Sequence, residues 1–261
     1  MKLDPKEVRE AILDATEGEG KATFVLAPLE TVPSGVPPLW KKALTGADPR
    51  AAVLELLWKP LATKYPKTLR VLQRALQGVG LLSTRKRGHS LVYLFALDED
   101  GEPTLWRGYP PAKTLPKIAS RLPADFLALY EVHDGWLDEW GQMGPRRSVD
   151  WAPLGKSGAS RDMHITFEGH GPGNLGFDLS EPDAPCYIVW NDSAPERVRK
   201  IASRIDDWML AQMEEFEPAK PAKPAKPAKP AKPAKPAKPA KPAKHAKPAK
   251  GAKPNAKPRG R

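Results

Sequence analysis

The residues most able to carry out chemistry lie between His164 and Gly176. His164, Glu168 and His170 are of types that bind metals or transfer protons. However, His164 and Glu168 share one face of an expected strand, while His170 falls in the following turn. They form no H-E-x-x-H or comparable array. We therefore interpret the histidines as a surface residue and a turn residue, and we expect no metal site.

The glycines of the same stretch satisfy the pattern G-x-G-x-x-G between positions 171 and 176. A dinucleotide-binding loop needs a strand before these glycines and a helix after them, so that the helix N-terminus meets the pyrophosphate. Here the glycines run into a stretch where Leu175, Phe177 and Leu179 occupy alternate positions, as in a half-buried strand. The pattern indicates a hairpin loop, and no cofactor is expected.

The possible nucleophiles lack the local patterns that activate such groups. Ser157, Ser160 and Ser193 have no G-x-S-x-G elbow around them. Cys186 opens an apolar strand, which is typical of a buried, inert thiol, and a single cysteine fits a reducing compartment. There is no signal-peptide pattern and no apolar run close to the roughly 20 residues of a membrane helix. We expect a non-enzymatic cytoplasmic protein, with the nucleoid as an alternative location.

Hydrophobic periodicity predicts the elements that would position these residues. Helices are predicted at 5–15, 49–58, 66–79 and 123–133, and a capping box at Ser193 and Glu196 predicts a last helix through Phe216. Strands are predicted at 22–26, 81–84, 91–96, 104–106, 163–167, 175–179 and 187–190. Helices flanking a run of antiparallel strands define an α+β fold. We expect an additional N-terminal α/β segment of undetermined role at 1–105, an α+β domain at 106–217 and a tail at 218–261.

Charge divides the chain into two different polymers. The whole chain carries a formal net charge of +11, but the 44 residues after Glu217 hold 13 Lys, two Arg and no acidic residue. Residues 1–217 hold 27 Lys and Arg against 31 Asp and Glu, a net charge of −4. Such asymmetry usually marks an interaction tail. The part of the chain expected to fold is therefore not a basic nucleic-acid binder.

The cationic arm, residues 218–261, repeats Pro-Ala-Lys nine times up to Lys244. It has almost nothing apolar to bury, so we expect it to be disordered, with a polyproline-II bias that lines up its lysines. Such an arm should bind nucleic acid non-specifically through counterion release. The predicted contacts are Lys220, Lys223, Lys226, Lys229, Lys232, Lys235, Lys238, Lys241, Lys244, Lys247, Lys250, Lys253, Lys257, Arg259 and Arg261.

The composition of the arm resembles the Lys/Ala/Pro-rich tails of linker histones. Three other interpretations stay open: a soluble spacer, a repeat expanded without a selected task, and contact with an anionic membrane surface.

Two further segments are candidates for contact with a partner. The segment 134–140 places two tryptophans among acidic residues near a helix end, as in protein-recognition hot spots. Its candidate partner-binding residues are Asp134, Trp136, Asp138, Glu139 and Trp140. The alternative is that both tryptophans fold back onto the core. Arg85-Lys86-Arg87 lies between two expected strands, as at the wing of a winged helix or at an ordinary solvated hairpin tip.

The second half of the chain resembles the SUKH superfamily, over roughly residues 110–217. Leu122–Tyr130, followed by His133-Asp134-Gly135, is similar to the helix that opens these domains. Gly173–Asp178, Cys186–Asp192 and the helix through Trp208 are similar, in order and spacing, to the later elements of the family. Asp134 stands where the family usually has Asn, and Trp136 follows the glycine.

Membership would imply a non-enzymatic α+β domain that binds a protein partner. In bacteria it would imply an immunity protein that neutralises a cognate toxin, often a nuclease. The net charge of −4 fits a basic partner. The alternative is a nucleic-acid-associated or chromosome-associated protein acting mainly through its arm, and an unrecognised hydrolase is the third hypothesis. The toxin and the oligomeric state stay open.

Overall fold

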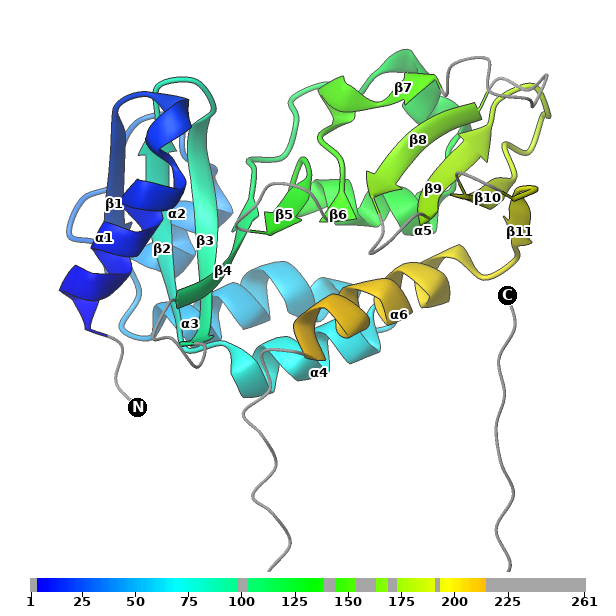
Figure 1. Cartoon of the computed structure of the whole chain (residues 1–261). Helices are drawn as coiled ribbons and strands as arrows, with labels where there is room; N and C mark the ends of the chain where they lie inside the picture. The colour runs from blue at the N-terminus through cyan, green and yellow to red at the C-terminus, as the bar shows by residue number, and fades with distance from the viewer. Residues whose placement is uncertain are drawn as a thin grey trace, which may run out of the picture. The chain divides into compact units, whose positions relative to one another are not determined.

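The computed structural model describes residues 4–97, 103–138, 144–153, 163–168, 173–190 and 193–214. These residues belong to one compact unit, Met1–Lys220, and the second unit, Pro221–Arg261, lies outside them. The described part contains two antiparallel sheets and several helices (Figure 1). The predicted α+β class is confirmed.

The first sheet has the strand order β1-β2-β3-β4-β5. Its strands are β1 (Ala22–Leu26), β2 (Gly78–Thr84), β3 (Gly88–Leu97), β4 (Pro103–Gly108) and β5 (Trp136–Asp138). The first helix, α1 (Pro5–Ala15), starts at Asp4, whose carboxylate accepts a hydrogen bond from the backbone N–H of Lys6. Val8 and Ile12 of α1 pack in one cluster with Phe24 of β1, so α1 covers one face of this sheet.

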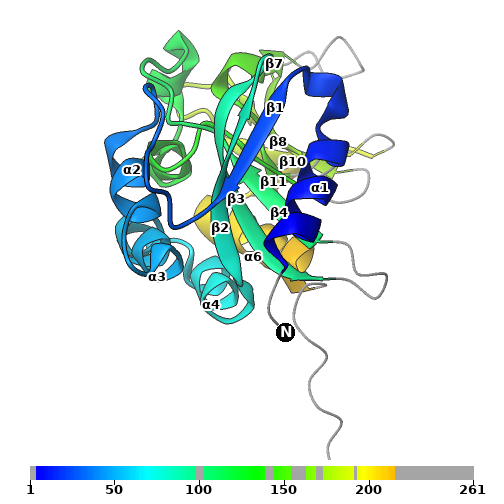
Figure 2. The same cartoon turned by 90° about the vertical axis from the view of Figure 1, so that its left-hand side faces the viewer.

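The opposite face of the first sheet is covered by helices α2 to α4 (Figure 2). These are α2 (Pro38–Leu44), α3 (Pro49–Val53) and α4 (Pro66–Ala75), with a π-helical turn (Leu54–Trp58) and a 3-10 turn (Lys59–Leu61) between α3 and α4. Each α-helix has a proline in its first turn, where the missing N–H is not needed. The helix at 38–44 was not predicted, because its prolines were assigned to a connection.

The second sheet has the order β11-β10-β9-β8-β6, and β7 also pairs with β8. Its strands are β6 (Gly144–Pro145), β7 (Ala152–Pro153), β8 (Met163–Glu168), β9 (Gly173–Asp178), β10 (Cys186–Trp190) and β11 (Glu196–Val198). The sequence placed Met163, Ile165 and Phe167 on one face. Instead, the register shifts between Ile165 and Phe167, so Phe167 enters the main core while Met163 and Ile165 join a cluster on the other face.

Three helix boundaries differ from the prediction. Residues 196–198 pair with β10 as a strand, so the last helix, α6 (Ile201–Glu214), does not begin at the capping box around Ser193. Val79, where the predicted helix at 66–79 would end, lies instead in strand β2 and pairs with Tyr93 of β3. The helix at 123–133 is α5 (Ala124–Leu127) followed by a 3-10 turn (Ala128–Glu131). In the first two cases, pairing with a neighbouring strand outweighs the local helix signal.

One hydrophobic core is shared by the two sheets and by α4 and α6. Leu72 of α4 and Tyr93 of β3 belong to the same buried cluster as Phe177 of β9 and Met209 of α6. The expected division between residues 105 and 106 falls within β4. Helix α6 lies alongside α4 (Figure 1), where the Asp206 carboxylate accepts hydrogen bonds from the backbone N–H groups of Lys67 and Thr68.

Candidate binding groove

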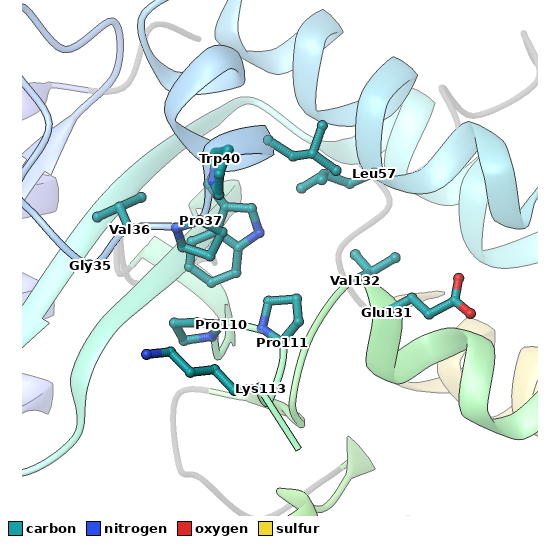
Figure 3. Close-up of a pocket in the computed structure, with 12 residues that line it drawn as sticks. Gly35, Val36, Pro37, Trp40, Leu57, Pro110, Pro111, Lys113, Glu131 and Val132 are labelled. Atoms are coloured by element: carbon teal, nitrogen blue, oxygen red, sulfur yellow. The ribbon is translucent and has the colours of Figure 1, made fainter. Parts of the chain in front are cut away.

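An apolar groove of about 440 Å³ opens on the surface of the described residues. Four segments line it: the start of α2 with the loop before it, the loop after β4, the end of the 3-10 turn that follows α5, and the π-helical turn after α3. Its lining residues are Gly35, Val36, Pro37, Pro38, Leu39, Trp40, Leu57, Pro110, Pro111, Lys113, Glu131 and Val132. Figure 3 shows Trp40 between the prolines of the first two segments.

Charge is confined to two side chains of this lining. In Figure 3, Lys113 and Glu131 extend to opposite sides and point away from each other. Leu39 is 50% exposed, which is unusual for a leucine of this fold. An apolar centre with a sparse polar rim is the composition expected of a site that binds an apolar side chain or a small molecule.

Beneath the groove, Trp40 packs on a buried group of aromatic side chains. Its ring lies 5.3 Å from the ring of His133, and His133 in turn lies 5.4 Å from the ring of Trp136, centroid to centroid. Trp58 Nε1 donates a hydrogen bond to the Tyr93 hydroxyl at 3.0 Å, and that hydroxyl lies 2.7 Å from His133 Nε2. We call Trp40, Trp58, Tyr93, His133 and Trp136 the aromatic cluster.

Burial controls the protonation of this cluster. It lowers the pKa of His133 to about 3, and it raises the pKa of Tyr93. The ring of His133 lies directly over Gly108, where any Cβ would clash with it. His133 is only 4% exposed and is neutral near pH 7, so it packs as a core residue and is not presented to a ligand in the groove.

The structure places two of the predicted partner-binding residues in the interior. Trp136 is 2% exposed and packs edge-on against Trp58, with ring centroids 4.9 Å apart. Asp134 is 3% exposed and accepts a hydrogen bond from the backbone N–H of Ser148 at 2.7 Å. For Trp136, the alternative of packing onto the core holds, and neither side chain can reach a partner in this fold. Of Asp138 only the backbone is described, and Glu139 and Trp140 lie outside the described residues.

The basic triplet Arg85-Lys86-Arg87 sits at the turn between β2 and β3, but it is not simply solvated. Lys86 Nζ donates to the backbone oxygen of Gly18, and Arg87 donates to the hydroxyl of Tyr109. Arg87 also pairs with Glu19, whose carboxylate is held by two hydrogen bonds from the buried Arg107. This hairpin tip is therefore tied to the segment after α1, unlike the free wing that the sequence allowed.

Within the described residues no cluster of His, Cys, Asp and Glu could hold a metal ion, and His170 lies outside them. Gly173 begins strand β9, so the glycine pattern does run into a strand. Cys186 is buried, and its burial raises the thiol pKa to about 12, as expected of an inert thiol. The 15 predicted nucleic-acid contacts of the arm lie outside the described residues.

The sequence analysis does not predict the groove, although its prolines are a visible signal. The Pro-Pro pairs at 37–38 and 110–111 flank Trp40 and Lys113, but only the fold brings them together. No family model matches the chain, and no similar curated protein or solved structure was found. No helix among the described residues has the length and apolar character needed to cross a bilayer.

Proposed function

We propose that the chain is a non-enzymatic protein-binding module with an arm that binds nucleic acid without sequence preference. The observation that carries the proposal is the segregation of charge: +15 in the last 44 residues against −4 in the 217 before them. A strand of cations without acids binds phosphate backbones by releasing counterions. The acidic remainder is free to contact a basic protein partner, because opposite charge speeds their encounter.

Binding of the intact chain to a random-sequence duplex tests the role of the arm. The affinity should fall steeply with salt, because each neutralised phosphate contributes about 0.9 to the slope of log K against log salt concentration. A variant with all 13 arm lysines changed to Gln should lose most of the affinity and most of that slope. The matched variant with the same lysines changed to Arg keeps the charge and should keep both. Equal binding by the Gln and Arg variants would overturn the role of the arm.

The resemblance of residues 110–217 to the SUKH superfamily supports a more particular role for the module, that of an immunity protein against a toxin such as a nuclease. The net charge of −4 supports a basic partner. The groove supports a binding role, because it offers apolar lining and the half-exposed Leu39 on the surface. The arm would then keep the module near the nucleic acid that the toxin attacks.

Competition between sister cells tests immunity without knowledge of the toxin. Bacteria that lack the gene should be killed by unmodified sister cells in mixed culture, and expression of the chain should restore their survival. Leu39→Glu should restore it less well, whereas Val149→Glu should act like the parent chain, since Val149 is 71% exposed and lies outside the groove. Survival of the cells without the gene would count against immunity.

The alternative function is that of a chromosome-associated or RNA-associated protein in which the arm does the work. Its support is the same block of 15 cations. The variant with Gln at the 13 lysine positions of the arm distinguishes the two proposed functions. That variant should still protect cells if the chain is an immunity protein, and it should lose all activity if the arm is the main functional part.

A further inference from the structure

The open edges of the two sheets are not alike. At the edge of the second sheet, β11 is three residues long and carries Glu196 and Arg197, while β6 is two residues long and ends in Pro145. Short length, charge and proline are the usual means by which an edge avoids pairing with another chain. Strand β1 has none of them: its five residues, Ala-Thr-Phe-Val-Leu, are uncharged and free of proline.

The register of β1 shows which backbone groups point outward. Lys21 O accepts from Arg85 N, and Ala27 N donates to Val79 O, on either side of the pairs that join β1 to β2. In an antiparallel ladder, residues bonded to the neighbouring strand alternate with residues whose N–H and C=O point away from it. The odd-numbered residues therefore bond to β2. The backbone groups of Ala22, Phe24 and Leu26 face the open edge, which is turned to the viewer in Figure 2.

The side chains of β1 leave this edge accessible. Phe24 is buried, and its ring lies over Gly80 of β2, so it leans into the sheet and away from the edge. Thr23 is exposed, and Val25, at 51%, is among the most exposed large apolar residues of the fold. Within the described residues, β1 pairs with β2 alone.

We propose that β1 pairs antiparallel with β1 of a second copy of this chain, joining two five-stranded sheets into one. A two-fold axis at Phe24 sets Ala22 opposite the partner's Leu26, so that all the outward-facing backbone groups meet their complements. The same register sets Val25 opposite the partner's Thr23, in the closely spaced type of cross-strand pair that suits β-branched side chains. Lys21 falls opposite the partner's Ala27, so no like charges meet.

A second copy fits this edge because the sequence of β1 is complementary to itself under a two-fold axis, as an isologous interface requires. A five-residue strand buries little surface, and interfaces below about 1,200 Å² are usually weak and transient. The dimer should therefore form reversibly as the concentration rises. Salt of about 0.3 M, where the Debye length is well under 10 Å, limits repulsion between the two cationic arms.

Sedimentation of the full chain tests the proposal, in that salt, up to about 1 mM, where an interface with a Kd of that size is half formed. The average mass of the parent chain should rise from that of a monomer towards that of a dimer. The double variant Thr23→Lys/Val25→Lys should stay monomeric, because Lys would face Lys across the axis, and so should Thr23→Glu/Val25→Glu. A mixture of the two should dimerise again, since each Lys then faces a Glu. Val149→Lys is the matched control and should behave like the parent.

Disulfide trapping checks the register. Thr23→Cys and Val25→Cys, mixed in oxidising buffer, should cross-link far more than either variant alone, because position 23 faces position 25 and not itself. Native Cys186 is buried and should stay unreacted. A parent chain that stays monomeric at about 1 mM overturns the proposal. So does a dimer that the charge substitutions leave intact, or one in which each cysteine variant cross-links equally well alone.

Discussion

Two buried polar sites hold this fold together in different ways. At the junction of α4 and α6, Asp206 is 2% exposed and accepts hydrogen bonds from Lys67 N at 2.9 Å, Thr68 N at 2.8 Å and the Thr68 hydroxyl at 2.7 Å. In the aromatic cluster, His133 is 4% exposed and is linked to Tyr93 and Trp58 by one line of hydrogen bonds. At the first site several donors converge on the Asp206 carboxylate, whereas at the second site His133 is kept neutral.

The Asp206 site works as a helix cap supplied from a distant part of the chain. Tyr65, at the cap position of α4, makes no side-chain hydrogen bond to the helix. The N–H groups in the first turn of α4 donate to the Asp206 carboxylate instead. A negative charge at this end of the helix also interacts favourably with the helix dipole. The comparison shows that an acid can be buried where backbone donors converge on it. A histidine buried without an acidic partner is tolerated only in its neutral form.

The largest effect is expected from Asp206→Ala, which removes the acceptor from two backbone N–H groups and a hydroxyl. We expect the free energy of unfolding to fall by about 3–5 kcal/mol, measured by urea denaturation. Asp207→Ala is the matched control at the next position. Asp207 pairs with Lys67 at the partly exposed surface, so the change should be much smaller. Equal effects of the two changes would contradict the cap.

Acidification from pH 6.5 to 5 should have the next largest effect. Burial lowers the folded-state pKa of His133 to about 3, from an ordinary value of 6.5. Below pH 6.5 the unfolded chain binds a proton that the folded chain does not. The free energy of unfolding therefore decreases as the pH is lowered, by about 2 kcal/mol over this window. The lowered pKa of Glu19, held by Arg107, acts only below its ordinary value of 4.5.

Unfolding of His133→Gln across the same pH range is the control for that prediction. This variant should be less stable at pH 7, but its stability should change little between pH 6.5 and 5. A parent-like loss of stability in the variant would show that another group titrates.

A smaller effect is expected from Tyr93→Phe, which keeps the ring and removes the hydroxyl between Trp58 and His133. The free energy of unfolding should fall by about 1–2 kcal/mol, because buried polar groups lose their partner. A double-mutant cycle with Trp58→Phe, followed by thermal unfolding, should reveal coupling between the two positions. Strictly additive changes would mean that the hydrogen bond contributes nothing.

The smallest effect is expected at an exposed pair on the surface of the same helical region. Lys59 and Glu55 form an i,i+4 ion pair, with both side chains more than half exposed. Glu55→Gln should cost about 0.3–0.5 kcal/mol at low salt, and the difference should vanish in high salt. A loss comparable to that of Tyr93→Phe would remove the distinction between buried and exposed polar contacts.

Much of this fold follows from local patterns, and its corrections follow from contacts between distant residues. Alternation located β8 and β9, but it could not reveal the register shift that moves Phe167 to the other face, since a bulge depends on the neighbouring strand. Asp4 adjoins the helix that it caps, so a local pattern can reveal it, whereas Asp206 caps a helix through Thr68, which lies 138 positions away in the sequence. The sequence around Trp136 suggests a surface contact, but the fold packs this strand residue against Trp58 of the distant π-helical turn.

The groove illustrates the same limit. Its prolines are visible in the sequence, but four separate segments must meet before they enclose a volume. The charge of the arm, by contrast, needs no fold to be recognised. Nucleic-acid binding by the arm can therefore be predicted from composition alone, whereas the groove can be recognised only in the folded structure.

The distance between Thr68 and Asp206 along the chain also has a consequence for synthesis. At ribosomal rates of about 5–20 residues per second, residue 206 emerges roughly 7 to 28 seconds after residue 68. During that interval the amides at the start of α4 have only water as a partner, and the apolar side of that helix lacks α6. The nascent chain is therefore most vulnerable to misassociation midway through translation, and slowing elongation between these two positions should lower the yield of folded protein.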